Sequence, residues 1–133
     1  MAVGCCLTLV FSAPALAAVE VELLFQSDVD GLGQQLRYPG TAAQLTGAIV
    51  TLAPGATTGW HTHEIPVAGY VLEGELVVQY HSGETRKFVA GEGVIEVLDA
   101  PHQGYNAGEV PLKLVVFYAG GAGIELSAPA AAP

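Results

Sequence analysis

The feature that most constrains the fold is a succession of short apolar and β-branched runs, separated by turn residues. We predict nine strands, at 21–26, 46–53, 57–63, 67–72, 75–80, 85–89, 93–98, 103–106 and 112–118. Turn signals of Gly, Pro, Asp and Asn recur about every eight to twelve residues, and no helical period follows residue 18. This spacing predicts an all-β sandwich or barrel.

The two ends of the chain differ in composition from this β-rich middle. Residues 1–18 carry no charge, and their apolar stretch leads to Ala15-Leu16-Ala17, the small-x-small pattern that signal peptidases cleave. We interpret 1–18 as a signal peptide that lacks the usual basic start, and it is too short to span a membrane. We therefore expect a periplasmic or secreted protein. Residues 127–133 predict a disordered tail, so that one barrel domain spans 19–126.

The charge balance limits the partners of the chain. Thirteen Asp and Glu residues against four Lys and Arg residues give a formal net charge of −9. A nucleic acid or an anionic lipid surface would repel such a protein. We therefore expect no nucleic-acid partner and consider a small molecule instead.

A His-x-His pair, His61 and His63, is the first sign of chemistry. Alternate residues of a strand project to the same face, so the two imidazoles should lie side by side. Such a pair can share one divalent metal, although two histidines on one face can also form a simple polar patch. Glu64 follows directly and should face away from any metal.

Two groups of residues around this pair resemble the two sequence motifs of the cupin superfamily. The first motif is Gly, five residues, His-x-His, three or four residues, Glu, six residues and Gly, and here it falls on Gly55, His61, His63 and Gly74. The second is Gly, five residues, Pro-x-Gly, two residues, His, three residues and Asn, and here it falls on Gly91, His102 and Asn106. The resemblance covers 55–106 and implies a double-stranded β-helix, or jelly-roll barrel.

The same resemblance implies that His61, His63 and His102 are three ligands of one metal, Fe, Mn, Ni or Zn. Three histidines leave coordination positions open for water or substrate. The chain departs from the motifs at Val67, where the glutamate ligand is expected, and at Val97 and Asp99, where Pro and Gly are expected.

Glu96 could replace the missing glutamate. It interrupts the apolar run 93–98, and it is either a metal ligand, a general base, or a carboxylate on the solvent side of a strand. Trp60 should pack on the outside of the barrel or at an interface, and Tyr118 should be structural. Gln103 and Tyr105 either line the mouth of the pocket or flank a loop. His81, in a Ser-Gly turn, should be a surface residue.

Two classes of function follow. In the first, the chain is a metal-dependent enzyme, dioxygenase-like or isomerase-like, that acts on a small organic molecule. In the second, it is a non-catalytic module that holds a small molecule or a metal, and a metal-free interaction barrel is a third reading. The fold alone does not choose between them. Because small cupins commonly pair through an edge strand, we also expect a homodimer, with the apolar segment 21–25 as the strand that is exchanged.

Overall fold

The computed structural model of the chain describes residues 19–133, which form β-strands and no helix. The strands are β1 (Ala43–Leu52), β2 (His61–Thr62), β3 (Val67–Glu73), β4 (Glu75–Tyr80), β5 (Thr85–Val89), β6 (Gly93–Ile95), β7 (His102–Tyr105), β8 (Leu112–Gly121) and β9 (Ala128–Pro129). Within this part of the chain, nothing resembles a membrane-crossing helix. The predicted signal peptide, 1–18, lies outside the described residues.

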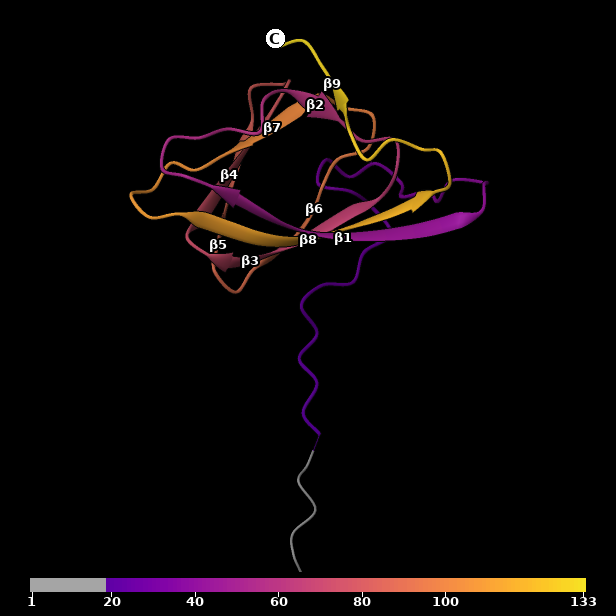
Figure 1. Ribbon diagram of the computed structural model, residues 1–133, viewed down its shortest axis with the longest axis horizontal. Helices are drawn as coiled ribbons and strands as arrows, with labels where there is room; N and C mark the ends of the chain where they lie inside the picture. The colour runs from indigo at the N-terminus through magenta and orange to yellow at the C-terminus, as the bar shows by residue number, and fades with distance from the viewer. Residues whose placement is uncertain (1–18) are drawn as a thin grey trace, which may run out of the picture.

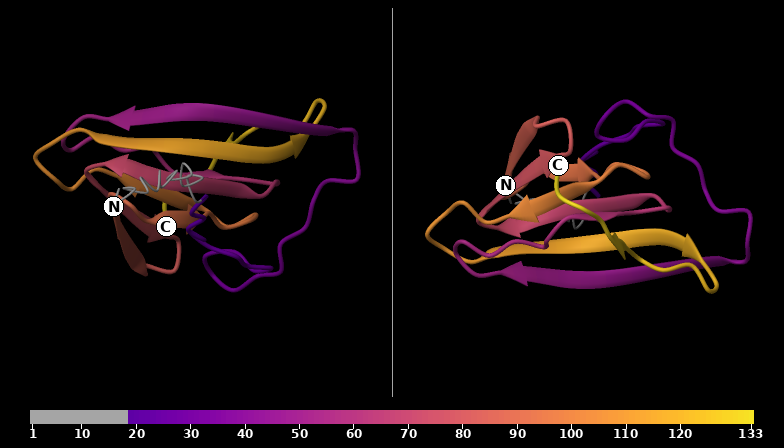
Figure 2. Two further views of the ribbon diagram at one scale, coloured as in Figure 1. Left: turned by 90° about the horizontal axis from the view of Figure 1, so that it is seen from below. Right: turned by 90° about the horizontal axis from the view of Figure 1, so that it is seen from above.

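Two antiparallel sheets face each other as layers (Figures 1 and 2). The first has the order β1-β8-β3-β6 and the second the order β5-β4-β7-β2-β9. Strands β1 and β8, far apart in sequence, pair along their whole length from Ala43 opposite Gly121 to Leu52 opposite Leu112. The architecture confirms the predicted all-β jelly-roll barrel.

The alternation of side chains along each strand builds the core between the layers. In β8, Leu112, Leu114 and Val116 are buried while Phe117 is 49% exposed. This period of two is what a sheet with one covered face requires. The buried set from both sheets is Leu52, Ile65, Val67, Val71, Leu76, Val78, Tyr80, Val94, Val97, Leu112, Leu114 and Val116.

Several motif residues turn out to shape the end of the barrel. Gly74 has a φ of 78°, and a Cβ at this position would lie 2.7 Å from the carbonyl oxygen of Pro111. Only glycine fits there without displacing the backbone. The buried side-chain amide of Asn106 donates to the carbonyls of Leu52 and Val110, at 3.0 and 2.7 Å. These residues therefore hold the loops that join the two sheets.

Asp99, which stands where the motif has glycine, keeps the conformation that glycine would have. Its φ is 56°, and it is the one non-glycine residue of 19–133 with a positive φ. Asp is among the few residues that enter this left-handed region at modest cost. Its backbone N–H donates to the carbonyl of His63 at 2.8 Å, and its carboxylate pairs with Arg37. The departure from the motif therefore preserves the turn.

Both ends of the domain differ from the prediction. The segment 21–26 is not a strand: it lies near β5 and the start of β6 but forms no ladder with either, and Val21 and Leu23 are 85% and 72% exposed. The tail at 127–133 is not disordered throughout, since β9 pairs with β2 and the N–H of Ala130 donates to the carbonyl of Trp60 at 2.9 Å. The prediction of disorder rested on the low complexity of this tail, which contains no information about the edge of β2 that the tail covers.

A buried carboxylate, Asp30, fastens the loop that precedes β1. Its oxygens accept hydrogen bonds from the backbone N–H groups of Leu32, Gln34 and Leu98, all at 2.9 Å, and from the side chain of Gln34 at 3.1 Å. Asp30 is 6% exposed. The bond to Leu98 joins residues far apart along the chain, so no local pattern of the sequence predicts it.

Candidate metal centre

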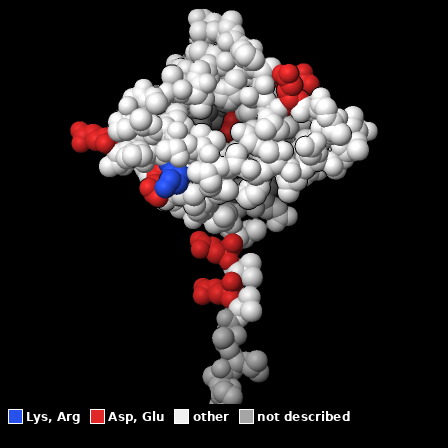
Figure 3. Space-filling view, viewed as in Figure 1, with Lys and Arg blue, Asp and Glu red and all other residues white. Residues whose placement is uncertain are grey.

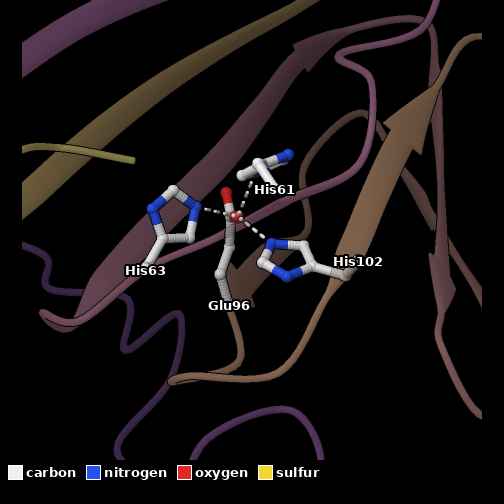
Figure 4. A group of neighbouring side chains, drawn as sticks. All are labelled: His61, His63, Glu96 and His102. Carbon is white, nitrogen blue, oxygen red and sulfur yellow. Dashed lines mark hydrogen bonds and ion pairs between the residues drawn. The ribbon is translucent and has the colours of Figure 1, made fainter. Parts of the chain in front are cut away.

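Four side chains, His61, His63, Glu96 and His102, converge inside the barrel (Figure 4). Each offers a ligand atom, and these atoms lie within 4.8 Å of one another. The Nε2 atoms of His63, His102 and His61 lie 3.0, 2.9 and 3.9 Å from the same oxygen of Glu96, Oε2. The structure therefore brings the three predicted histidines together. Glu96 faces inward, which excludes the solvent-side alternative and leaves the metal ligand and the general base open.

Strand pairing explains why the histidines meet. His61 in β2 lies directly opposite His102 in β7, and His63 follows the end of β2. The predicted strand at 57–63 is shorter than expected because Gly59 has a φ of 74° and interrupts it. His61 and His63 still present their rings side by side, with centroids 4.8 Å apart.

Register also explains where Glu96 comes from. Strands β3 and β6 are antiparallel with Ala68 opposite Ile95, so the next pair places Glu96 opposite Val67, and the N–H of Glu96 donates to the carbonyl of Val67 at 2.9 Å. Opposite residues of an antiparallel pair project to the same side of the sheet. The Glu96 carboxylate thus enters the barrel from the residue opposite Val67, the position at which the motif has its glutamate.

The other ring nitrogen of each histidine is held by the backbone. The Nδ1 atoms of His61, His63 and His102 lie 2.9, 2.7 and 2.9 Å from the carbonyl oxygens of Gly59, Leu126 and Ala100, respectively. A carbonyl oxygen only accepts, so each Nδ1 carries the hydrogen and each neutral ring keeps a free lone pair on Nε2. Three ring nitrogens and a carboxylate oxygen therefore face one point, and this donor set could hold a metal ion.

The side chains of this cluster shift one another's pKa values. Burial by itself would raise the pKa of Glu96, but the hydrogen bonds from His102 and His63 and the charge of these rings hold it well below its usual range. Burial opposes protonation of His63, yet the hydrogen bond and charge of Glu96 and the carbonyl of Leu126 raise its pKa. Burial lowers the pKa of His61. The carboxylate is therefore an anion, as a metal ligand must be.

A cavity of about 470 Å³ opens beside the four side chains and is lined by residues of both sheets. Figure 3 shows this face, hollowed at its centre with acidic atoms visible in the hollow. Its volume lies in the range of small-molecule sites. Trp60, expected on the outside of the barrel, lines it instead, because the turn at Gly59 redirects the chain. Tyr118, expected to be structural, also lines it, with its ring centroid 6.0 Å from that of His63.

The remaining predicted residues lie outside this cavity. Glu64 is exposed and faces away from the histidines, as expected. The side chain of Gln103 bonds to those of Thr57 and Gln79, and neither Gln103 nor Tyr105 lines the cavity. His81 is exposed in its turn, with its ring edge-to-face against Trp60 at 6.4 Å.

Comparisons with known proteins agree with this geometry. The family model described as "Cupin domain" matches residues 48–118. No curated protein matches the chain. Many solved structures do, and three of them serve as examples, each under 25% identical to this chain.

An oxalate decarboxylase from Lactobacillus farciminis has a TM-score of 0.56 at 23% identity, over 64% of this chain and 26% of that one. A Cupin 2 conserved barrel domain protein from Salinispora arenicola has a TM-score of 0.52 at 23% identity, over 62% and 69%. The polyketide cyclase RemF from Streptomyces resistomycificus has a TM-score of 0.57 at 19% identity, over 71% and 65%. The chain matches less than half the length of the decarboxylase. These likenesses establish the barrel and carry no substrate with them.

Proposed function

This chain belongs to the family of cupin domains, and on that premise we propose that it binds one divalent transition metal through His61, His63, His102 and Glu96 and acts on a small organic molecule beside it. The metal would be Fe, Mn, Ni or Zn. Nitrogen and carboxylate donors in this combination suit all four metals.

The observation that carries the proposal is the fixed tautomer of the three rings. Each Nδ1 is held by a backbone carbonyl, so that each Nε2 points toward the same oxygen of Glu96. Such outer hydrogen bonds orient metal-binding histidines and raise their basicity. A polar patch on a barrel wall would not need three rings held in this way.

A bound metal would act as a Lewis acid toward an oxygen of the substrate. The other roles at the site belong to residues of the chain. The backbone carbonyls fix the imidazoles, Glu96 contributes one negative charge, and apolar walls surround the substrate. The side chains of Trp60 and Tyr118 contact whatever occupies the space beside the histidines.

Metal content tests the proposal. The purified chain, as isolated and after reconstitution with Fe, Mn, Ni or Zn, is measured by inductively coupled plasma mass spectrometry. We expect about one equivalent of one metal, lost in a His61→Ala/His102→Ala variant and retained in His81→Ala, a histidine outside the cluster. No metal in any form of the protein would contradict the proposal. The metal-loaded chain is then screened with phenols and enols for oxygen uptake or isomerisation, which separates an enzyme from a binding module.

We also propose that the chain is exported and cleaved near Val19. The uncharged stretch 1–18 with its Ala15-Leu16-Ala17 pattern supports this. Expression of the full chain in a bacterial host, followed by fractionation and N-terminal sequencing, should find the protein in the periplasm or medium with a new terminus near Val19. An intact terminus in the cytosolic fraction would contradict export.

A further inference from the structure

The walls of the cavity are predominantly apolar. Strands β1, β4 and β8 contribute Val50, Leu52, Leu76, Val78, Leu114 and Val116. The polar groups between them are neutral: the hydroxyls of Thr58, Tyr118 and Ser127 and the indole of Trp60. Apart from the four side chains of the metal centre, no residue that lines this cavity is charged.

The cationic side chains of the protein are all engaged elsewhere. The chain has four Lys and Arg residues, and each pairs with a carboxylate: Arg37 with Asp99, Arg86 with Glu84, Lys87 with Glu75, and Lys113 with Glu73. Their side chains are between 38% and 61% exposed and none lines the cavity. A second anionic group on a substrate would therefore find no side-chain cation to pair with.

The charge of the proposed metal centre also leaves no partner for a second anionic group on the substrate. A divalent cation beside one carboxylate leaves a single positive charge, which is enough for one oxygen anion such as a phenolate or an enolate. An additional carboxylate placed among Leu76, Val78 and Leu114 would lose its hydration without a partner, and burying an unpaired charge is costly. The net charge of −9 on the whole chain adds to the repulsion.

From these observations we infer that the substrate is a largely apolar molecule that carries hydroxyl or carbonyl oxygen at one end and no other charged group. The inference rests on the proposed metal site and restricts the class of substrate that binds there. The oxygen-bearing end faces His61, His63, His102 and Glu96, and the apolar body lies against β1, β4 and β8. Small dicarboxylates are excluded by the same reasoning.

A matched pair of ligands tests the inference. 4-Methylcatechol and 3,4-dihydroxybenzoate carry the same two hydroxyls and differ in a methyl group against a carboxylate at the opposite side of the ring. Both are titrated calorimetrically into the zinc-loaded and the metal-free chain, because zinc prevents redox turnover. Trp60 is the one tryptophan of the chain and lines the cavity, so a change in its fluorescence locates the ligand. We expect the zinc-loaded chain to bind 4-methylcatechol at least about tenfold more tightly than 3,4-dihydroxybenzoate.

Two variants on strand β1, one a test and one its control, show whether the preference for 4-methylcatechol arises in the cavity. Val50 of β1 lines the cavity, and Val50→Lys should lower the preference for 4-methylcatechol by about tenfold, because the new ammonium pairs with the carboxylate. Ile49, its neighbour on the opposite face, is 59% exposed, and Ile49→Lys should leave the preference unchanged. Zinc content and thermal unfolding are measured for both, so that a folding defect is not mistaken for a binding effect.

The outcomes separate the two proposals. A chain that holds zinc but binds 3,4-dihydroxybenzoate as tightly as 4-methylcatechol, or binds neither, would overturn the inferred substrate class and leave the metal centre standing. A chain that binds no zinc but still prefers 4-methylcatechol would contradict the metal proposal alone. An equal effect of Val50→Lys and Ile49→Lys would show that the discrimination does not arise in the cavity, and this would also overturn the inference.

Discussion

At the residue scale, the position of Glu96 opposite Val67 shows how a site can be preserved when a motif residue is replaced. The two positions are neighbours across β3 and β6, so a carboxylate on either one reaches the same space. Along the chain, Val67 stands at the glutamate position of the motif, so the carboxylate ligand is missing there. Only the register between the two strands shows where the carboxylate stands.

Replacing this carboxylate should weaken the metal site. Glu96→Gln keeps the shape of the side chain but removes the anionic oxygen that faces the three rings. We expect the affinity for zinc to fall by about tenfold or more, as measured by competition with a chelator. Glu64→Gln is the matched control, because Glu64 follows His63 but lies outside the cavity. Equal affinity in Glu96→Gln and the unaltered chain would show that Glu96 is no ligand.

Moving the carboxylate across the strand pair tests the register argument. Glu96→Val should lose the affinity, and Val67→Glu/Glu96→Val should regain a large part of it, within about tenfold of the unaltered chain, because the carboxylate then enters from the opposite residue. Zinc affinity and thermal unfolding are measured together, since Val67 is buried in the core. A folded double variant that binds zinc no better than Glu96→Val would contradict the argument.

At this scale the three histidines were predictable from the sequence, whereas the direction of Glu96 was not. The histidines fall on a motif with defined spacing. Alternation along the run 93–98 does not by itself say which face of the strand lies inward, and the pairing with β3 that decides this joins segments distant in sequence. Trp60 was misplaced for another reason, since Gly59 interrupts the alternation before it.

At the scale of elements, the C-terminal strand β9 supports the cluster of His61, His63, Glu96 and His102. Its pairing with β2 places Pro129 opposite His61, and the carbonyl of Leu126, just before it, holds the Nδ1 of His63 at 2.7 Å. Strand β9 and Leu126 thus contact two of the three histidines. The low complexity of the tail predicts disorder, and the contact that orders it lies with a strand more than about sixty residues earlier, which composition does not show.

Truncation separates the two parts of this tail. A chain that ends at Glu125 loses the carbonyl of Leu126 and strand β9, and its zinc affinity should fall by about 10–100-fold, as for the loss of other outer-shell partners. A chain that ends at Ala130 keeps both contacts and should bind zinc like the full chain. Equal affinities of the two truncated chains, in a chelator competition, would contradict a positioning role for the tail.

The Asp30 loop should contribute to stability. In Asp30→Asn an amide nitrogen replaces one of two oxygens that together accept four hydrogen bonds, so at least one buried N–H loses its acceptor. We expect the free energy of unfolding in urea to fall by about 2–3 kcal/mol. Asp28→Asn, at an exposed position of the same loop, should change it by less than about 0.5 kcal/mol. A similar small change in both variants would show that the loop is not fastened by Asp30.

At the scale of the whole molecule, short strands and turns were predictable and the ends were not. The bounds of β4 and β5 match the predicted runs, because both are flanked by turn residues and pair with each other across a short turn. The order of the strands in the two sheets follows from contacts between distant segments, which no local pattern contains.

We propose that two copies of the chain associate through the N-terminal segment. Val19, Val21 and Leu23 are 90%, 85% and 72% exposed in a single copy, and this segment runs away from the barrel in Figure 1. Size-exclusion chromatography with light scattering should find a dimer that a Val21→Glu/Leu23→Glu variant converts to a monomer. Leu45→Glu, on the exposed face of β1, should leave the dimer intact. Elution of the unaltered chain as a monomer would contradict the proposal.

The most direct test of the central claim is anomalous diffraction from crystals of the zinc-loaded chain. We expect one strong peak inside the barrel, with the Nε2 atoms of His61, His63 and His102 about 2.0–2.1 Å from it and an oxygen of Glu96 about 2.0–2.2 Å from it. Absence of a peak at this point, or a peak only at an exposed residue such as His81, would contradict the metal centre.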